Sequence, residues 1–215
     1  MSLLRTLVGI QKIGDTLATT ARAGKAGDMI VSNLHGKYYE AASRGQVFCA
    51  STLAAGIVVP FIAVTVASKF TLVNPAASGV NVELIDISVQ RVPGTSLITG
   101  LGMAFQGPLA STGGYPGTLT VSTGSHGCTL VGSGTVPPCV HYSAATHTNV
   151  AIANLTPVFW FMNTVATTII TEGPSMFSFD GKFVMPPDTA CCLVNSITGT
   201  QSAAAVSLTY AAFPI

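Results

Sequence analysis

Two short cysteine–histidine motifs are the part of this sequence best suited to chemistry. His126-Gly-Cys128 and Cys139-Val-His141 mirror each other about the turn-like stretch Gly-Ser-Gly-Thr at residues 132–135. In an antiparallel hairpin centred there, Cys128 faces Cys139 and His126 faces His141, all on one face because side chains alternate along a strand. Opposed cysteines can form a disulfide, and two thiols with two imidazoles can bind zinc.

Three interpretations of these motifs stay open. The four residues are ordinary thiols and surface histidines, or Cys128 and Cys139 form a cross-strand disulfide, or all four bind zinc. The ten residues between the cysteines are not a familiar zinc spacing, and Pro137-Pro138 remove hydrogen-bond donors just before Cys139. We therefore predict no resident metal or other cofactor, with the disulfide and the zinc site as alternatives.

The rest of the chain is poor in catalytic groups. Only eight residues are acidic, and Asp180 and Asp188 stand near glycine or proline, as turn residues do. Glu83 and Asp86 are three apart in an expected strand, so we predict that they point to opposite faces. No phosphate-binding glycine loop, Gly-x-Ser-x-Gly or His-Glu-x-x-His motif occurs. We predict no catalytic residues, no small-molecule substrate and no enzymatic activity.

The elements that must position these residues are mostly β-strands. The clearest alternation runs from Val80 to Arg91, bounded by turn residues on both sides. Shorter strands are expected at residues 70–73, 96–105, 118–122, 129–131, 150–154, 159–171, 176–179, 183–185, 190–194 and 203–211. Many strands with frequent turns and almost no helical pattern predict an all-β fold, either a jelly roll or another β-sandwich.

Aromatic residues and paired cysteines fit into these strands as packing groups. Cys191 and Cys192 occupy adjacent strand positions, so at least one is expected to be a buried small side chain. The sequence has one tryptophan, inside an aromatic triplet. We predict that this triplet anchors the core or a subunit interface; it consists of Phe159, Trp160 and Phe161.

An uncharged stretch from residue 45 to residue 67 raises the question of a membrane span. A helical span needs about 20 apolar residues. Here Pro60 interrupts the apolar run at residues 53–66, which is also rich in β-branched side chains. We predict two buried strands divided at Pro60 and no membrane association. No signal peptide is predicted, because Arg5 follows the first leucines and no adequate apolar core comes after it.

Charge is scarce and unevenly distributed. Charged residues make up 8% of the chain, against about 25% in an ordinary globular protein, while hydrophobic residues reach 48%. Such a chain folds, but its surface lacks the charges that oppose association. We therefore expect a subunit whose surfaces are covered by copies of itself or by other partners.

The first 44 residues form a distinct basic segment. They hold six basic and three acidic residues, a net charge of +3, whereas residues 45–215 hold three basic and five acidic ones, a net charge of −2. We predict an N-terminal arm at 1–44, partly helical over 3–22, and a β-domain at 45–215. A charge of +3 is small for a nucleic-acid-binding tail, so no nucleic-acid partner is predicted. The expected partner-contacting residues are Leu3, Leu4, Arg5, Leu7, Lys12, Arg22 and Lys25.

Two parts of the chain resemble virion proteins of tailed bacteriophages. The first is Asp28–Phe48, continued by Leu72–Val82. The second, Asp180–Ala190 with Ala204–Pro214, is similar to the closing strands of trimeric jelly-roll subunits that decorate phage heads or form fibres. One departure is Ala212-Phe213, because such subunits often carry an acidic residue just before the final Val-Pro or Ile-Pro.

The resemblance implies a capsid cement or decoration protein. Such a subunit is a homotrimer on the outer capsid surface of the virion, assembled in the cytoplasm of a bacterial host, whose arms reach across neighbouring major capsid proteins. Its partners would be its own copies and the major capsid protein. The alternative that the resemblance leaves open is a trimeric subunit of a head fibre or a receptor-binding tail fibre.

Overall fold

The described part of the chain is almost entirely β-structure. The computed structural model describes residues 36–53, 56–58, 70–91, 101–107, 119–145, 158–162, 175–195 and 203–215. The chain divides into two units, residues 1–39 and 40–215, close to the predicted boundary at residue 44. Within the described ranges the only helix is α1 (Tyr39–Ser43), and the predicted helix at 3–22 lies outside them.

Two antiparallel sheets form the β-unit. The first has the strand order β10-β4-β13-β1-β7, with β11 also paired to β4 and β2 paired to β13. Its strands are β1 (Val47–Ser51), β2 (Ile57–Val58), β4 (Val80–Arg91), β7 (His126–Cys128), β10 (Ser175–Ser178), β11 (Val184–Met185) and β13 (Ala203–Pro214).

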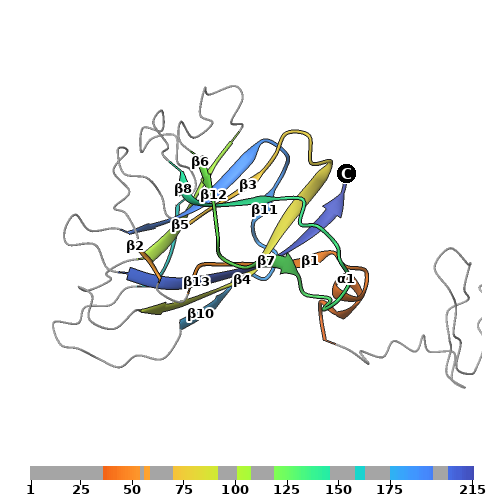
Figure 1. Cartoon of the computed structure of the whole chain (residues 1–215), viewed down its shortest axis with the longest axis horizontal. Coiled ribbons are helices and arrows are strands. Elements are labelled where there is room, and N and C mark those ends of the chain that lie inside the picture. Colours follow the sequence, from red (N-terminus) through yellow and green to blue (C-terminus); the bar gives the residue numbers. More distant parts are fainter. Residues whose placement is uncertain are drawn as a thin grey trace, which may run out of the picture. The chain divides into compact units, whose positions relative to one another are not determined.

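The second sheet has the order β6-β8-β3-β12-β5-β9. Figure 1 shows the two sheets as stacked layers. The strands of the second sheet are β3 (Thr71–Asn74), β5 (Leu101–Gln106), β6 (Leu119–Val121), β8 (Val140–Ala145), β9 (Val158–Met162) and β12 (Thr189–Asn195).

One hydrophobic core fills the space between the layers. The first sheet contributes alternate residues of β4 and β13, such as Leu84 and Leu208, and the second contributes Leu72, Met103 and Leu193, all fully buried. This alternation follows from the pleat, which sends every second side chain to the same face. The predicted all-β sandwich is confirmed, while its jelly-roll connectivity remains a prediction.

A β-bulge in β4 corrects one expectation about the acidic residues. The register with β13 shifts between Thr209, which faces Asp86, and Tyr210, which faces Leu84, so Ile85 is the extra residue. Glu83 faces Ala211, two residues beyond Thr209, and therefore lies on the same outer face as Asp86. The prediction that Glu83 and Asp86 point to opposite faces is wrong, because it assumed unbroken alternation.

The other strand predictions have mixed outcomes. Val80–Arg91 is a strand over its full predicted length, but residues 129–131 belong to a connection and the strand lies just before them, at β7. In the apolar run, β2 occupies part of the stretch before Pro60, and the expected strand after Pro60 lies outside the described residues, as does 150–154. None of the helical structure in the described ranges is long or apolar enough for a membrane span.

Asn74 ties one end of the sandwich together. This fully buried residue ends β3 in the second sheet, and its side-chain amide donates to the carbonyls of Val80 (2.9 Å) and Met185 (3.0 Å). Both acceptors lie in strands of the first sheet, so one side chain links β3 to β4 and β11. Buried carbonyls without donors are costly, which makes this amide a structural requirement.

We expect Asn74→Ala to lower the free energy of unfolding by about 2 kcal/mol, because the buried carbonyl of Met185 and the part-buried carbonyl of Val80 both lose their donor. Asn81→Ala is the matched control, since Asn81 is only partly buried in β4, and it should change stability by less than about 0.5 kcal/mol. Urea unfolding followed by the single tryptophan measures both values. Equal stability of the two variants would contradict this role of Asn74.

Candidate functional site

The two cysteine–histidine motifs do not form a hairpin. β7 pairs with β1, where Cys128 faces Phe48, whereas β8 pairs with β3, where His141 faces Leu72. The ten residues between the motifs carry the chain from one sheet to the other, so their mirror symmetry reflects no strand pairing.

This correction removes the basis of two alternatives. Cys128 and Cys139 were expected to be hairpin neighbours, and the register argument for a disulfide or a zinc site depended on that. Both are free thiols in the structure, Cys139 buried and Cys128 half-buried. Across the described ranges, no group of three or more His, Cys, Asp or Glu side chains is arranged to hold a metal ion.

Three residues of the two motifs, His126, Cys139 and His141, nevertheless meet between the sheets, around Tyr210 of β13. The hydroxyl of Tyr210 lies 2.7 Å from Nε2 of His126 and shares a hydrogen bond with the thiol of Cys139. The rings of His126 and His141 lie edge to face, with centroids 6.2 Å apart. We call these four residues, His126, Cys139, His141 and Tyr210, the interlayer cluster.

Aromatic packing holds the interlayer cluster in place. Tyr210 stacks on Phe48 of β1 with ring centroids 5.5 Å apart, and His141 lies 4.6 Å from the ring of Phe70. His141 is 2% exposed, and its ring nitrogens have no hydrogen-bond partner in the described part of the chain. The cluster therefore sits in an apolar setting, where charge is strongly disfavoured.

Burial shifts every titratable group of the cluster towards its neutral form. Burial, with a smaller contribution from the charge of His126, lowers the pKa of His141 to about 4, and burial also lowers the pKa of His126. Burial raises the pKa of the Cys139 thiol to about 12, and burial with the neighbouring thiols raises the pKa of Tyr210. At neutral pH the cluster is an uncharged, hydrogen-bonded part of the core.

These shifts decide what chemistry the cluster can do. A nucleophilic cysteine needs a lowered pKa and access to solvent, and Cys139 has a raised pKa and is 4% exposed. A histidine base needs a partner that orients it, and His141 has none among the described residues. The arrangement suits a polar contact between the sheets rather than acyl transfer.

Tyr210 is the member that the sequence analysis missed. Its inward neighbours along β13 are apolar, including Val206 and Leu208, so it is a tyrosine on an otherwise apolar strand face. A buried phenol needs a hydrogen-bond partner, and that requirement is the signal that could have revealed the cluster.

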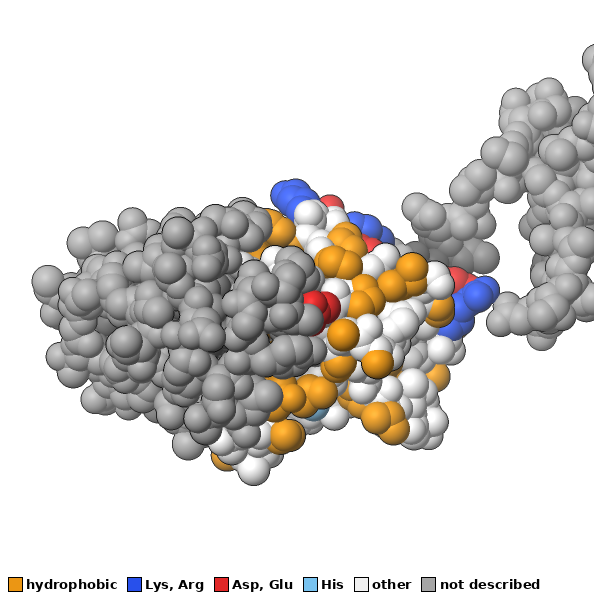
Figure 2. Space-filling view, turned by 90° about the horizontal axis from the view of Figure 1, so that it is seen from above, with side chains coloured by type: hydrophobic (Ala, Val, Ile, Leu, Met, Phe, Trp, Pro, Cys, Tyr) orange, Lys and Arg blue, Asp and Glu red, His pale blue; other side chains and the backbone are white. Residues whose placement is uncertain are grey.

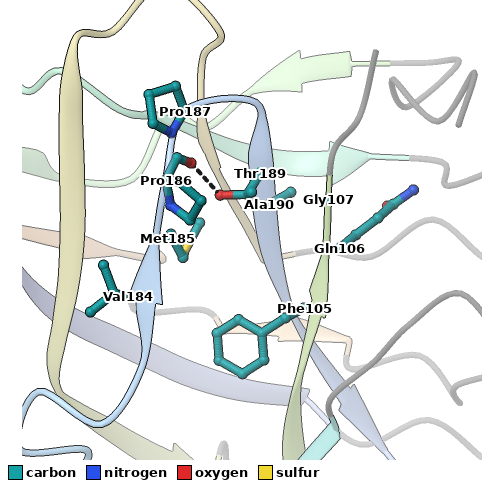
Figure 3. A pocket seen from close by; sticks show the side chains of 9 residues that line it. All are labelled: Phe105, Gln106, Gly107, Val184, Met185, Pro186, Pro187, Thr189 and Ala190. Atoms are coloured by element: carbon teal, nitrogen blue, oxygen red, sulfur yellow. Dashed lines mark hydrogen bonds between the residues drawn. The ribbon is translucent and has the colours of Figure 1, made fainter. Parts of the chain in front are cut away.

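The described part of the chain also has a pocket of about 340 Å³ between β5 and β11. Figure 3 shows Phe105, Val184 and Met185 around it, with Gln106 directed away on the other side of β5. The hydroxyl of Thr189 donates to the carbonyl of Pro186 at 2.6 Å, so it is already engaged. An apolar pocket of this kind accepts an aliphatic group but offers no converging polar side chains for catalysis.

Among the described residues, large apolar side chains are prominent on the surface. Figure 2 shows hydrophobic side chains scattered over one face, with few charged groups among them. Two of the most exposed, Val131 (96%) and Val136 (81%), lie in the connection between β7 and β8. The others that are large and exposed are Tyr39, Leu53, Val121, Leu130, Met176, Val184 and Ile215.

The remaining predicted site residues are only partly placed. The aromatic triplet lies in β9, at the edge of the second sheet, and consists of Phe159, Trp160 and Phe161. Along the backbone, Phe159 faces Met103 and Trp160 faces Gly102 of β5. The structure describes the backbone of this strand but not its side chains. All the predicted partner-contacting residues of the arm fall outside the described residues. Their roles stay predictions.

Comparison with known proteins adds no relative. The chain matches no protein-family model, no curated protein and no solved structure at a significant level.

We expect Tyr210→Phe to lower the free energy of unfolding by about 1–2 kcal/mol, because His126 and Cys139 both lose their partner in the core. Tyr39→Phe, which removes a hydroxyl from a side chain that is 50% exposed, is the matched control and should have little effect. Thermal or urea unfolding compares the two. A neutral Tyr210→Phe substitution would show that the hydroxyl contributes nothing to the packing of the sheets.

The cysteines should be free and unequally reactive. Without reductant, the unfolded chain should show all five thiols. In the native protein at pH 8, Cys139 should react at least about tenfold more slowly than Cys49 or Cys128, because it is buried and its pKa is raised. Labelling followed by peptide mass mapping measures each rate. Only three thiols after unfolding would instead demonstrate a disulfide.

Proposed function

We propose that this chain is a structural virion subunit, a capsid cement or decoration protein that stabilises a phage head by contacts with the major capsid protein. The observation that carries the proposal is that nine large apolar side chains are exposed among the described residues, in a chain with only 8% charged residues. Apolar side chains that are this exposed are covered when proteins assemble, and few charges oppose that assembly.

The interlayer cluster and the pocket support a structural role rather than an enzymatic one. The cluster keeps its thiol, phenol and imidazoles neutral inside the core, whereas catalysis depends on groups that titrate near the working pH. The pocket lacks converging polar side chains. The β-unit thus provides a stable body and a surface suited to contacts.

The proposed assembly is a homotrimer on the outer surface of the capsid. The basic segment at 1–44 is the part that would reach the major capsid protein, since it holds six of the nine basic residues in the chain. Charge complementarity with an acidic capsid surface would speed that encounter more than it would raise the final affinity. The resemblance to trimeric phage subunits supports both the trimer and its location.

The proposal predicts a complex of three chains in solution and binding to capsids assembled without this chain. The double variant Val131→Asp with Val136→Asp places two charges on the connection between β7 and β8. It should weaken either trimer formation or capsid binding at least about tenfold, without unfolding the chain. Thr120→Asp with Thr123→Asp is the matched control at exposed polar positions. Light scattering and capsid co-sedimentation measure the two contacts.

Two results would overturn this proposal. One is a stable monomer at micromolar concentration that does not bind capsids. The other is saturable binding to host cells without binding to capsids, which would favour the alternative of a receptor-binding fibre subunit.

A further inference from the structure

The two histidines of the interlayer cluster face each other from different sheets. His126 belongs to β7 of the first sheet and His141 to β8 of the second, with their rings 6.2 Å apart and nearly perpendicular, at 89°. His141 is almost fully buried, whereas His126 is half-buried at the edge of its sheet. A proton added to either ring places a positive charge between the layers.

No carboxylate among the described residues shifts the pKa of either histidine. Tyr210 of β13 contacts His126, and the titratable groups that interact with Tyr210 are Cys139 before β8, Cys191 from β12 and Cys49 from β1. All four are acids that are neutral when protonated, and burial raises the pKa values of Tyr210, Cys139 and Cys191 further. Burial alone lowers the pKa of His126, whereas burial and then the charge of His126 lower the pKa of His141, and no carboxylate is among these causes.

The element most easily displaced by such a charge is β7. It has three residues, and β1 is its only partner strand in the described part of the chain, whereas β8 lies between β3 and β6. The connection that follows β7 contains Gly132 and Gly134 with φ values of +83° and +68°, left-handed conformations that glycine adopts without strain. The pairing of β4 with β13 is far longer and does not depend on β7.

We propose that His126 and His141 form an acid-sensitive latch between the sheets, so that protonation of either ring releases β7 while the β4–β13 pair stays intact. At neutral pH both rings are uncharged and the latch is closed. In acid, His126 moves towards water with β7, and this edge of the core opens. The inference concerns the β-unit alone, so it can hold or fail separately from the proposed place on a virion.

The direction of the pH effect follows from linkage. A histidine freed by opening has a pKa near 6.5, and burial in the closed state lowers the pKa of His141 to about 4. The open state therefore binds protons first, so opening becomes more favourable as the pH falls from about 6.5 to about 4. For one histidine the opening equilibrium rises about tenfold per pH unit in this window and levels off below it.

Hydrogen exchange of the full-length chain at pH 7.5 and pH 4.5 tests the latch. After correction for the pH dependence of intrinsic exchange, protection of residues 126–129 should fall at least about tenfold at pH 4.5, while β13 keeps its protection. His141→Phe, which keeps an aromatic ring beside Phe70 but cannot be protonated, should lose the share of the pH dependence that His141 contributes, so that protection of β7 falls clearly less than in the unaltered chain. Unchanged protection of β7 in the natural chain, or the same fall in His141→Phe, would overturn the proposal.

A second variant and a second measurement keep the proposal testable if His141→Phe does not fold. His126→Gln keeps a polar group for Tyr210 without a titratable ring, and it should reduce the pH dependence in the same way. Titration of the histidine ring signals by NMR in the unaltered chain needs no substitution. The latch requires that His126 and His141 both titrate below the pKa of about 6.5 of a free histidine, and titration of either ring near 6.5 would refute it.

Discussion

The antiparallel pairing of β4 with β13 is the interaction on which the rest of the structure depends. It joins residues 80–91 to residues 204–214 along eleven paired positions, and every other strand of the first sheet attaches directly or through β1 to this pair. The bulge at Ile85 adjusts the alternation so that Leu84 and Tyr210 both point into the core. The Ile85 carbonyl in turn accepts from the amides of Phe179 and Asp180, which fixes the turn between β10 and β11.

The same pairing places the interlayer cluster in the core. Tyr210 stands among apolar neighbours on β13, and its hydroxyl reaches β7 through His126 and the second sheet through Cys139. Asn74 makes the corresponding link at one end of the sandwich, from β3 to β4 and β11. Both side chains fix how the two layers align, because a slip would leave buried polar groups without partners.

Alternation made the fold class and the strand Val80–Arg91 predictable, since a half-buried strand shows its period in the sequence. The only sign of the bulge in the sequence is that the alternating apolar residues change from even positions, up to Leu84, to odd positions, from Ile87 on. The predicted hairpin is wrong because mirrored residue types do not specify which strands pair. Long-range packing places β7 and β8 in different sheets. His126 and His141 still meet, but across the sandwich, a contact that no local pattern encodes.

The described residues form a β-sandwich with a neutral core and several exposed apolar side chains, in a chain that is poor in charge. The proposal that this chain is a structural part of a particle can be tested on the particle itself. The measurement is electron cryomicroscopy of particles purified from the host that expresses the chain. We expect density for the sandwich in trimers on the outer capsid surface, with an extended segment over neighbouring subunits. Particles that lack the chain, or density for it at a tail tip alone, would overturn the proposal.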